Sequence, residues 1–153
     1  MLKAVVDSTL FVSGLIARGV PYAVVDAWRR QFFVLLLSDA QRAELYAVLS
    51  RPRITSRYLL PAEVEDFLYA LDTLALPAPL RLPLPVTVSD PNDEHIVAAA
   101  LGGQADYLVS GDVRHILPLA GDPRLGALRI LTARDFITLL QRDFAYVIPP
   151  EVR

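Results

Sequence analysis

The stretch DPNDEHIVAAALGGQADYLVSGDVRHIL, residues 90–117, contains the signals of a helix followed by a buried strand. Asp90 can cap a helix that begins at Pro91 and continues to about residue 101, where two consecutive glycines end it. The apolar run Tyr107–Val109 then predicts a short strand, which ends at a Ser-Gly-Asp turn. A helix that leads directly into a short apolar strand is typical of a fold in which helices and strands alternate.

The same alternation extends over the rest of the chain. Short apolar segments predict further strands over Leu2–Val6, Gln31–Leu37, Pro85–Ser89 and Arg129–Leu131. Helices are expected between them over residues 10–17, 22–30, 38–49, 61–75 and 132–142, with capping signals at Ser38 and Thr132. These connections predict a three-layer α/β fold with a mostly parallel central sheet, whose functional site lies at the carboxyl ends of the strands.

Length and composition place the chain among compact folded domains. It has 153 residues, of which 54% are hydrophobic and 21% are charged. One domain over residues 1–153 is therefore expected, with a core over about 2–142 and a C-terminal tail over 143–153. The proline-rich residues 76–91 are interpreted as an extended connection within this domain. The longest apolar run, Phe32–Leu37, is too short to cross a bilayer, so neither a membrane span nor a signal peptide is expected.

The charged residues and the missing cysteines narrow the classes of function. With no cysteine, disulfides, zinc ribbons, iron–sulfur clusters and thiol catalysis are excluded, and a cytoplasmic location is expected. The formal net charge of −2 means that a nucleic acid would have to bind a local basic patch. Arg51, Arg53 and Arg57 form such a patch in the sequence and could contact phosphates. All basic residues except Lys3 are arginines, and this preference also has a plainer explanation in genomic composition or a warm habitat.

Four acidic residues are expected at the carboxyl edge of the sheet. Asp7 follows the first strand, Asp112 follows the strand Tyr107–Val109, and Asp93 lies in the first turn of the preceding helix. Glu44 is in the middle of a helix, on a stripe with Ala40, Ala47 and Val48 that is predicted to face inward.

Each acid also has an ordinary structural explanation, as a helix cap or a turn residue. Together, however, clustered carboxylates destabilise a fold unless a cation offsets their charge. A site built only from oxygen ligands favours Mg²⁺ or Mn²⁺, and such an ion can activate water for phosphodiester hydrolysis.

Four segments resemble those of PIN-domain proteins, and most closely the toxin components of toxin–antitoxin systems known as VapC toxins. They are AVVDSTLFVSGLI, LSDAQRAELYAVLSRPRI, the stretch quoted first, and RILTARDFITLL, which together extend from about Leu2 to Leu140. The resemblance implies a three-layer PIN-like fold and a Mg²⁺- or Mn²⁺-dependent ribonuclease whose acidic cluster is Asp7, Glu44, Asp93 and Asp112. It also implies a cognate antitoxin protein as partner, a homodimer and an RNA substrate.

The chain departs from the usual family pattern in the residues that follow the first acid. The family usually has Asn two residues after the first Asp, whereas this chain has Thr9, whose hydroxyl can still orient Asp7 or a bound water. Ser110 stands where Thr is common and keeps the hydroxyl group. Asp90 is assigned to helix capping, and Asp106 is interpreted as a strand-entry residue that supports the acidic rim.

The sequence therefore predicts an endoribonuclease that is the toxin of a type II toxin–antitoxin pair. The alternative is a PIN-fold protein with weak or no catalysis that binds an antitoxin or RNA. Two other enzyme classes with an acid after the first strand are disfavoured. A haloacid-dehalogenase-like phosphatase needs a second Asp where Thr9 stands, and a receiver domain needs a late Lys, whereas Lys3 is the single lysine. His95 and His115 lack metal-ligand spacing, and a zinc site is disfavoured.

Overall fold

A computed structural model describes residues 1–55 and 58–152 and shows a five-stranded parallel sheet. The strand order across the sheet is β3-β2-β1-β4-β5. The strands are β1 (Lys3–Val6), β2 (Val34–Leu37), β3 (Leu76–Pro77), β4 (Tyr107–Val109) and β5 (Arg129–Leu131). The mostly parallel sheet expected from the sequence is confirmed.

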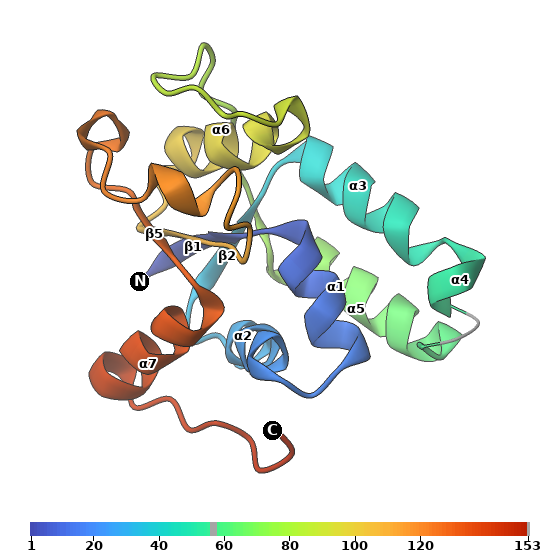
Figure 1. Cartoon of the computed structure of the whole chain (residues 1–153). Helices are drawn as coiled ribbons and strands as arrows, with labels where there is room; N and C mark the ends of the chain where they lie inside the picture. Colours follow the sequence, from blue (N-terminus) through green and yellow to red (C-terminus); the bar gives the residue numbers. More distant parts are fainter. Residues whose placement is uncertain (56–57, 153) are drawn as a thin grey trace.

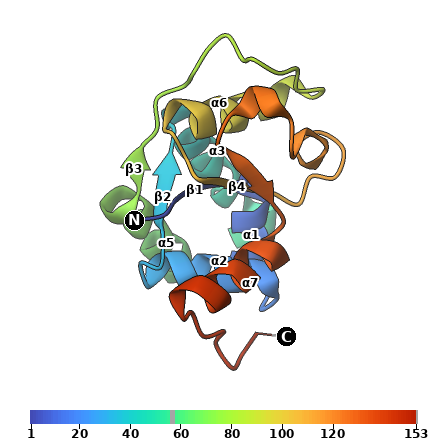
Figure 2. The same ribbon diagram turned by 90° about the vertical axis from the view of Figure 1, so that its left-hand side faces the viewer.

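Helices cover both faces of this sheet and complete a three-layer α/β/α arrangement (Figures 1 and 2). Helix α6 lies on one face, and α1, α2, α5 and α7 lie on the other. Helix α3 packs between α1 and α6. The bounds of the helices are α1 (Ser8–Ile16), α2 (Val20–Arg29), α3 (Asp39–Leu49), α4 (Pro52–Thr55), α5 (Pro61–Leu74), α6 (Glu94–Gly102) and α7 (Ala133–Phe144).

The strands are apolar on both faces because both faces are covered by helices. Val5, Leu36 and Leu108 point toward α6 and belong to one hydrophobic cluster. Val6 and Leu37 belong to the second cluster, which lies between the sheet and the other helices. Neighbouring residues along a strand point to opposite faces, so a continuous run of apolar residues supplies both clusters at once.

Helices α1 and α2 approach each other closely at Gly14. A Cβ atom on Gly14 would lie 2.6 Å from the carbonyl oxygen of Pro21 and 2.7 Å from a methyl group of Val25. Beside this crossing, the rings of Phe11 and Trp28 pack edge to face with centroids 5.8 Å apart. The contact fixes the direction of α1, and α1 begins at the carboxyl edge of β1.

Side-chain caps begin two of the helices at the residues expected from the sequence. Ser38 Oγ accepts a hydrogen bond from the backbone N–H of Gln41 at 3.1 Å, and α3 follows directly. Thr132 Oγ1 accepts one from the N–H of Asp135 at 3.2 Å, at the start of α7. Each bond satisfies a donor that has no partner within the first turn of a helix.

The third strand is not where the sequence predicted it. It is Leu76–Pro77, which pairs with β2, and not Pro85–Ser89. Val86 and Val88 of the predicted segment are buried, but they belong to the hydrophobic cluster that also contains residues of α6 and do not form a strand. Alternating apolar residues indicate that one side of a segment is buried, and here the segment is buried in this cluster without forming a strand.

The residues after α7 pack against the fold rather than extending from it as a tail. Tyr146 is 2% exposed, and its hydroxyl donates to the carbonyl of Ala23 at 3.1 Å and to Asp26 Oδ2 at 2.8 Å. Arg30 lies over the Tyr146 ring, 5.7 Å from its centroid. This segment therefore crosses α2 on the side away from the sheet.

Within the part of the chain that the structure describes, no single helix is long and apolar enough to span a membrane. Among the described residues, α1 and α2 taken together reach the required length and composition, but they are bent by 99° relative to each other.

Candidate functional site

Asp7 occupies the junction between β1 and α1 at the carboxyl edge of the sheet. Its backbone N–H donates to the carbonyl of Val109 at 2.9 Å, which continues the pairing of β1 with β4 by one residue. Its side chain caps α1, because Oδ1 accepts from the N–H of Thr9 at 3.3 Å. The residue is 7% exposed, so its carboxylate is held in a fixed position.

Ser110 connects Asp7 to Asp112. Its hydroxyl donates to Asp7 Oδ2 at 2.8 Å and accepts from the backbone N–H of Asp112 at 3.0 Å. Ser110 itself is fully buried after the end of β4. The ends of the two central strands are therefore joined through one hydroxyl group.

The pKa of Asp112 is lowered by the turn that follows it. Burial acts to raise the pKa of this carboxyl, but the backbone N–H groups of His115 and Arg114 both donate to Oδ1 at 2.9 Å. These bonds stabilise the charged form, and the pKa falls below its ordinary value. Asp112 is therefore a carboxylate at neutral pH.

Asp93 lies at the end of the short 3₁₀ helix Pro91–Asp93, directly before α6. Burial raises the pKa of Asp93 to about 6, helped by a hydrogen bond with Asp112 and by the charges of Asp112, Asp7 and Asp90. Burial also raises the pKa of Asp7, with smaller contributions from the charges of Asp112 and Glu44. The carboxyl groups are thus close enough to oppose each other's ionisation.

The three aspartates line one cavity of about 330 Å³, called the acidic cavity below. Its remaining wall comes from α1 and from the turn after β4. The lining residues are Asp7, Thr9, Leu10, Ser13, Asp93, Gly111 and Asp112. The structure thus brings together three acids from three separate segments of the chain.

A second cavity, of about 390 Å³, adjoins the first and is called the arginine cavity below. It shares Asp7, Thr9, Ser13 and Asp93 with the acidic cavity. Glu44, Arg51 and Arg53 line its other parts. Two of the predicted phosphate-binding arginines therefore lie beside the acids, while Arg57 lies outside the described residues.

Glu44 reaches the site, although not on the inward stripe that the sequence predicted. Ala40 and Ala47 are exposed, and the buried stripe of α3 consists of Gln41, Leu45 and Leu49. The Glu44 side chain is 39% exposed, and its Oε2 lies 3.6 Å from His95 Nε2. The prediction was wrong because small apolar residues on a helix fit a solvent-facing surface as well as a core.

Two further acids have structural roles. Asp90 Oδ1 accepts from the N–H of Asn92 at 3.0 Å and caps the 3₁₀ helix, as expected. Asp106 lies at the start of β4, where its Oδ2 accepts from the N–H of Lys3 at 2.8 Å. Parallel strands begin at the same edge, so Asp106 is at the opposite edge of the sheet from Asp7 and does not support the acidic rim.

The donor set suits a hard divalent cation, because every candidate ligand is a carboxylate oxygen. Burial and the neighbouring carboxylates raise the pKa of Asp93 to about 6, and a bound cation would offset the repulsion among these carboxylates. Within residues 1–55 and 58–152, however, no three His, Asp or Glu side chains form a ready-made ligand set for one ion. The site therefore has the charge and the donor type for Mg²⁺ or Mn²⁺, without a preformed cage.

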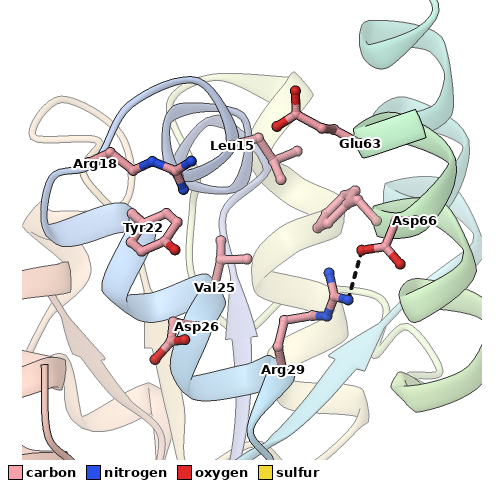
Figure 3. Close-up of a pocket in the computed structure, with 10 residues that line it drawn as sticks. Leu15, Arg18, Tyr22, Val25, Asp26, Arg29, Glu63 and Asp66 are labelled. Carbon is pink, nitrogen blue, oxygen red and sulfur yellow. Dashed lines mark hydrogen bonds and ion pairs between the residues drawn. The ribbon is translucent and has the colours of Figure 1, made fainter. Parts of the chain in front are cut away.

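Another cavity, of about 410 Å³, lies between α1, α2 and α5 and is separate from the acids (Figure 3). One ion pair crosses it, because Arg29 Nη2 contacts Asp66 Oδ2 at 2.9 Å. Arg18 lies over the Tyr22 ring, 4.5 Å from its centroid. Its lining carries both positive and negative side chains, whereas the charged residues that line the acidic cavity are all aspartates.

Sequence reasoning missed several residues of the two cavities next to the acids. Ser13 lines both, and it could have been found from its position one helical turn after Thr9. The apolar residues of the arginine cavity lie on four separate helices, and no spacing in the sequence connects them. They are Val12, Val48, Ile54 and Ile96.

Comparison with known proteins agrees with this architecture. The sequence profile of the PIN domain matches residues 3–114, which include all four predicted acids and the strands β1 to β4. A search of curated proteins found no match for the chain.

Proposed function

The chain belongs to the PIN-domain family, and from this premise we propose that it is an endoribonuclease that hydrolyses RNA phosphodiester bonds with the aid of Mg²⁺ or Mn²⁺. Members of this family are generally metal-dependent nucleases. The observation that carries the proposal is the acidic cavity, in which Asp7, Asp93 and Asp112 converge at the carboxyl edge of the sheet.

In this proposal Asp7, Asp93 and Asp112 hold the metal, and Glu44 completes the cluster or orients the attacking water. When bound, the ion would activate water and offset the charge that develops on the phosphate. Burial raises the pKa of Asp7, and the hydrogen bond from the Ser110 hydroxyl opposes that effect and favours the ionised form.

RNA would be held beside the acids by the arginine cavity. Arg51 and Arg53 supply positive charge within the same cavity as Asp7 and Asp93. Arginine binds phosphate through a planar pair of donors, and such contacts position a strand without reading its sequence. Affinity for RNA is therefore expected to fall as the salt concentration rises.

We propose further that the protein is the toxin of a type II toxin–antitoxin pair in the cytoplasm, with a cognate antitoxin protein as partner and a homodimeric state. This part rests on the resemblance to VapC toxins described above. Co-purification with the product of a short adjacent gene, and release of ribonuclease activity when that product is removed, would test it.

The test of the nuclease itself is cleavage of labelled RNA with Mn²⁺, with EDTA, and with the variant Asp93→Asn. We expect cleavage by the wild type in Mn²⁺ alone and loss of at least two orders of magnitude in the variant. Asp135→Asn is the matched control, because Asp135 is an exposed aspartate on α7. Metal-independent RNA binding without cleavage would favour the alternative of a binding module, and cleavage retained in Asp93→Asn would contradict the assignment of the site.

A further inference from the structure

The arginine cavity has apolar walls that a phosphate-binding surface alone would not need. Val12 lies on α1, Val48 on α3, Ile54 on α4 and Ile96 on α6, and all four line it. Ile54 is 9% exposed and Ile96 is 2% exposed, while the two valines are partly exposed. Four helices thus contribute aliphatic surface to one compartment next to the acids.

The same compartment carries positive charge from Arg51 and Arg53. An aliphatic surface with adjacent cationic donors matches a nucleotide, which has an apolar base face and an anionic phosphate. Its volume of about 390 Å³ lies within the range of small-molecule sites. The acidic cavity differs, since its lining includes three carboxylates and a single large apolar residue, Leu10.

The two cavities meet at Asp7 and Asp93, which line both. A phosphodiester placed at these carboxylates would therefore have the arginine cavity directly beside it. The base of the nucleotide next to the scissile phosphate can contact the aliphatic lining only if that base is not paired, because a paired base is stacked inside a duplex.

We propose that the arginine cavity is a base-binding compartment, in which one unpaired base packs on Val12, Val48, Ile54 and Ile96 while Arg51 and Arg53 contact the backbone phosphates. This inference rests on the proposed nuclease function and specifies its substrate. The four aliphatic residues are specificity-determining residues, because they contact the base while the arginines contact the phosphates.

The experiment compares binding of two oligonucleotides that have equal length and charge. One is a short single-stranded RNA, and the other is the same ribose-phosphate chain without bases. Binding is measured by fluorescence anisotropy at low ionic strength in EDTA, so that hydrolysis does not interfere. The wild type should bind the intact RNA at least tenfold more tightly than the base-free chain and more tightly than a duplex of the same sequence.

Variants then assign the difference to the cavity. Val48→Ala should weaken binding of the intact RNA about fivefold, since buried aliphatic carbons are lost, and leave binding of the base-free chain unchanged. Arg53→Gln should weaken both to a similar extent. Val147→Ala is the matched control, because Val147 is 69% exposed and lies in the segment after α7.

Equal binding of the two oligonucleotides by the wild type would overturn the inference, as would a Val48→Ala effect of the same size on both. The outcome is separate from that of the proposed function. Mn²⁺-dependent cleavage without base discrimination would rule out the base-binding compartment and support the nuclease function. Base discrimination without any cleavage would support the base-binding compartment and rule out the nuclease function.

Discussion

Ser110 Oγ donates a hydrogen bond of 2.8 Å to Asp7 Oδ2, joining two buried side chains that follow adjacent strands of the sheet. The bond acts on the ionisation of Asp7 in the direction opposite to burial. The uncharged Ser110 thus favours the ionised form of Asp7, which is the form that can bind a cation.

Ser110→Ala is expected to raise the pKa of Asp7 further, because the bond from Ser110 lowers it in the wild type. A carboxylate must be deprotonated to bind a metal. Mn²⁺ affinity, measured by calorimetric titration, should therefore decrease more at pH 6 than at pH 8. The unfilled acceptor should also cost about 1–3 kcal/mol of stability. Ser110→Thr, which keeps the hydroxyl, is the control, and an equal loss of affinity at both pH values would contradict the prediction.

Asp93 predicts how stability depends on pH in the metal-free protein. Its pKa is about 6 in the folded state and near 3.8 in an unfolded chain. The folded state therefore binds the proton more tightly, and the stabilisation is present below about pH 4 and is lost as the pH rises through 6. The asparagine of Asp93→Asn stays uncharged over this whole pH range. Its thermal midpoint should exceed that of the wild type at pH 7.5, and the difference should shrink toward pH 4.

Added Mn²⁺ should reverse that order. The ion should raise the midpoint of the wild type at pH 7.5 and leave Asp93→Asn nearly unchanged, since a ligand stabilises only the state that binds it. Asp135→Asn should behave like the wild type in both buffers. A midpoint of the wild type that does not respond to Mn²⁺ at any pH would argue against a metal site at this edge.

Gly14→Ala tests the close contact between α1 and α2. Alanine normally stabilises the interior of a helix by about 1 kcal/mol relative to glycine. Here the added Cβ would lie 2.6 Å from the Pro21 carbonyl oxygen, so the helices must separate, and we expect a net loss of about 1–3 kcal/mol in chemical denaturation. At Gly19 the nearest atom would be 3.8 Å away, which makes Gly19→Ala the matched control. A stabilised Gly14→Ala protein would contradict this packing.

Tyr146→Phe tests whether the segment after α7 is part of the fold. The variant loses the hydrogen bonds to Ala23 and Asp26, and we expect the free energy of unfolding to fall by about 1–2 kcal/mol. Tyr69→Phe, in which the original residue is 70% exposed, should have no measurable effect. If the two variants are equally stable, the hydroxyl of Tyr146 contributes nothing to holding the segment on α2.

The elements that sequence reasoning located well are those with a local physical signal. The run Gln31–Leu37 contains β2 because a strand covered on both faces must be continuously apolar. Ser38 and Thr132 were recognised as caps because their side chains bond to N–H groups only three residues away. The position of Asp7 follows from the chain order alone, since it comes after the first strand of a parallel sheet.

The errors have a common cause in contacts between distant parts of the chain. Val86 and Val88 alternate like strand residues, but only the tertiary structure shows that they are buried in a hydrophobic cluster without belonging to a strand. The inward stripe predicted for Glu44 failed because nothing in α3 itself says which face the rest of the molecule covers. The apolar lining of the arginine cavity could not be predicted, since it comes from four helices that the fold brings together.

The shortest strand of the sheet has a consequence for assembly. β3 consists of Leu76 and Pro77, both exposed, and it is an outer strand of the sheet. Proline has no N–H group to donate, so this border offers a second chain almost nothing to extend the hydrogen-bond ladder. A homodimer of this protein would accordingly not form by joining two sheets at β3.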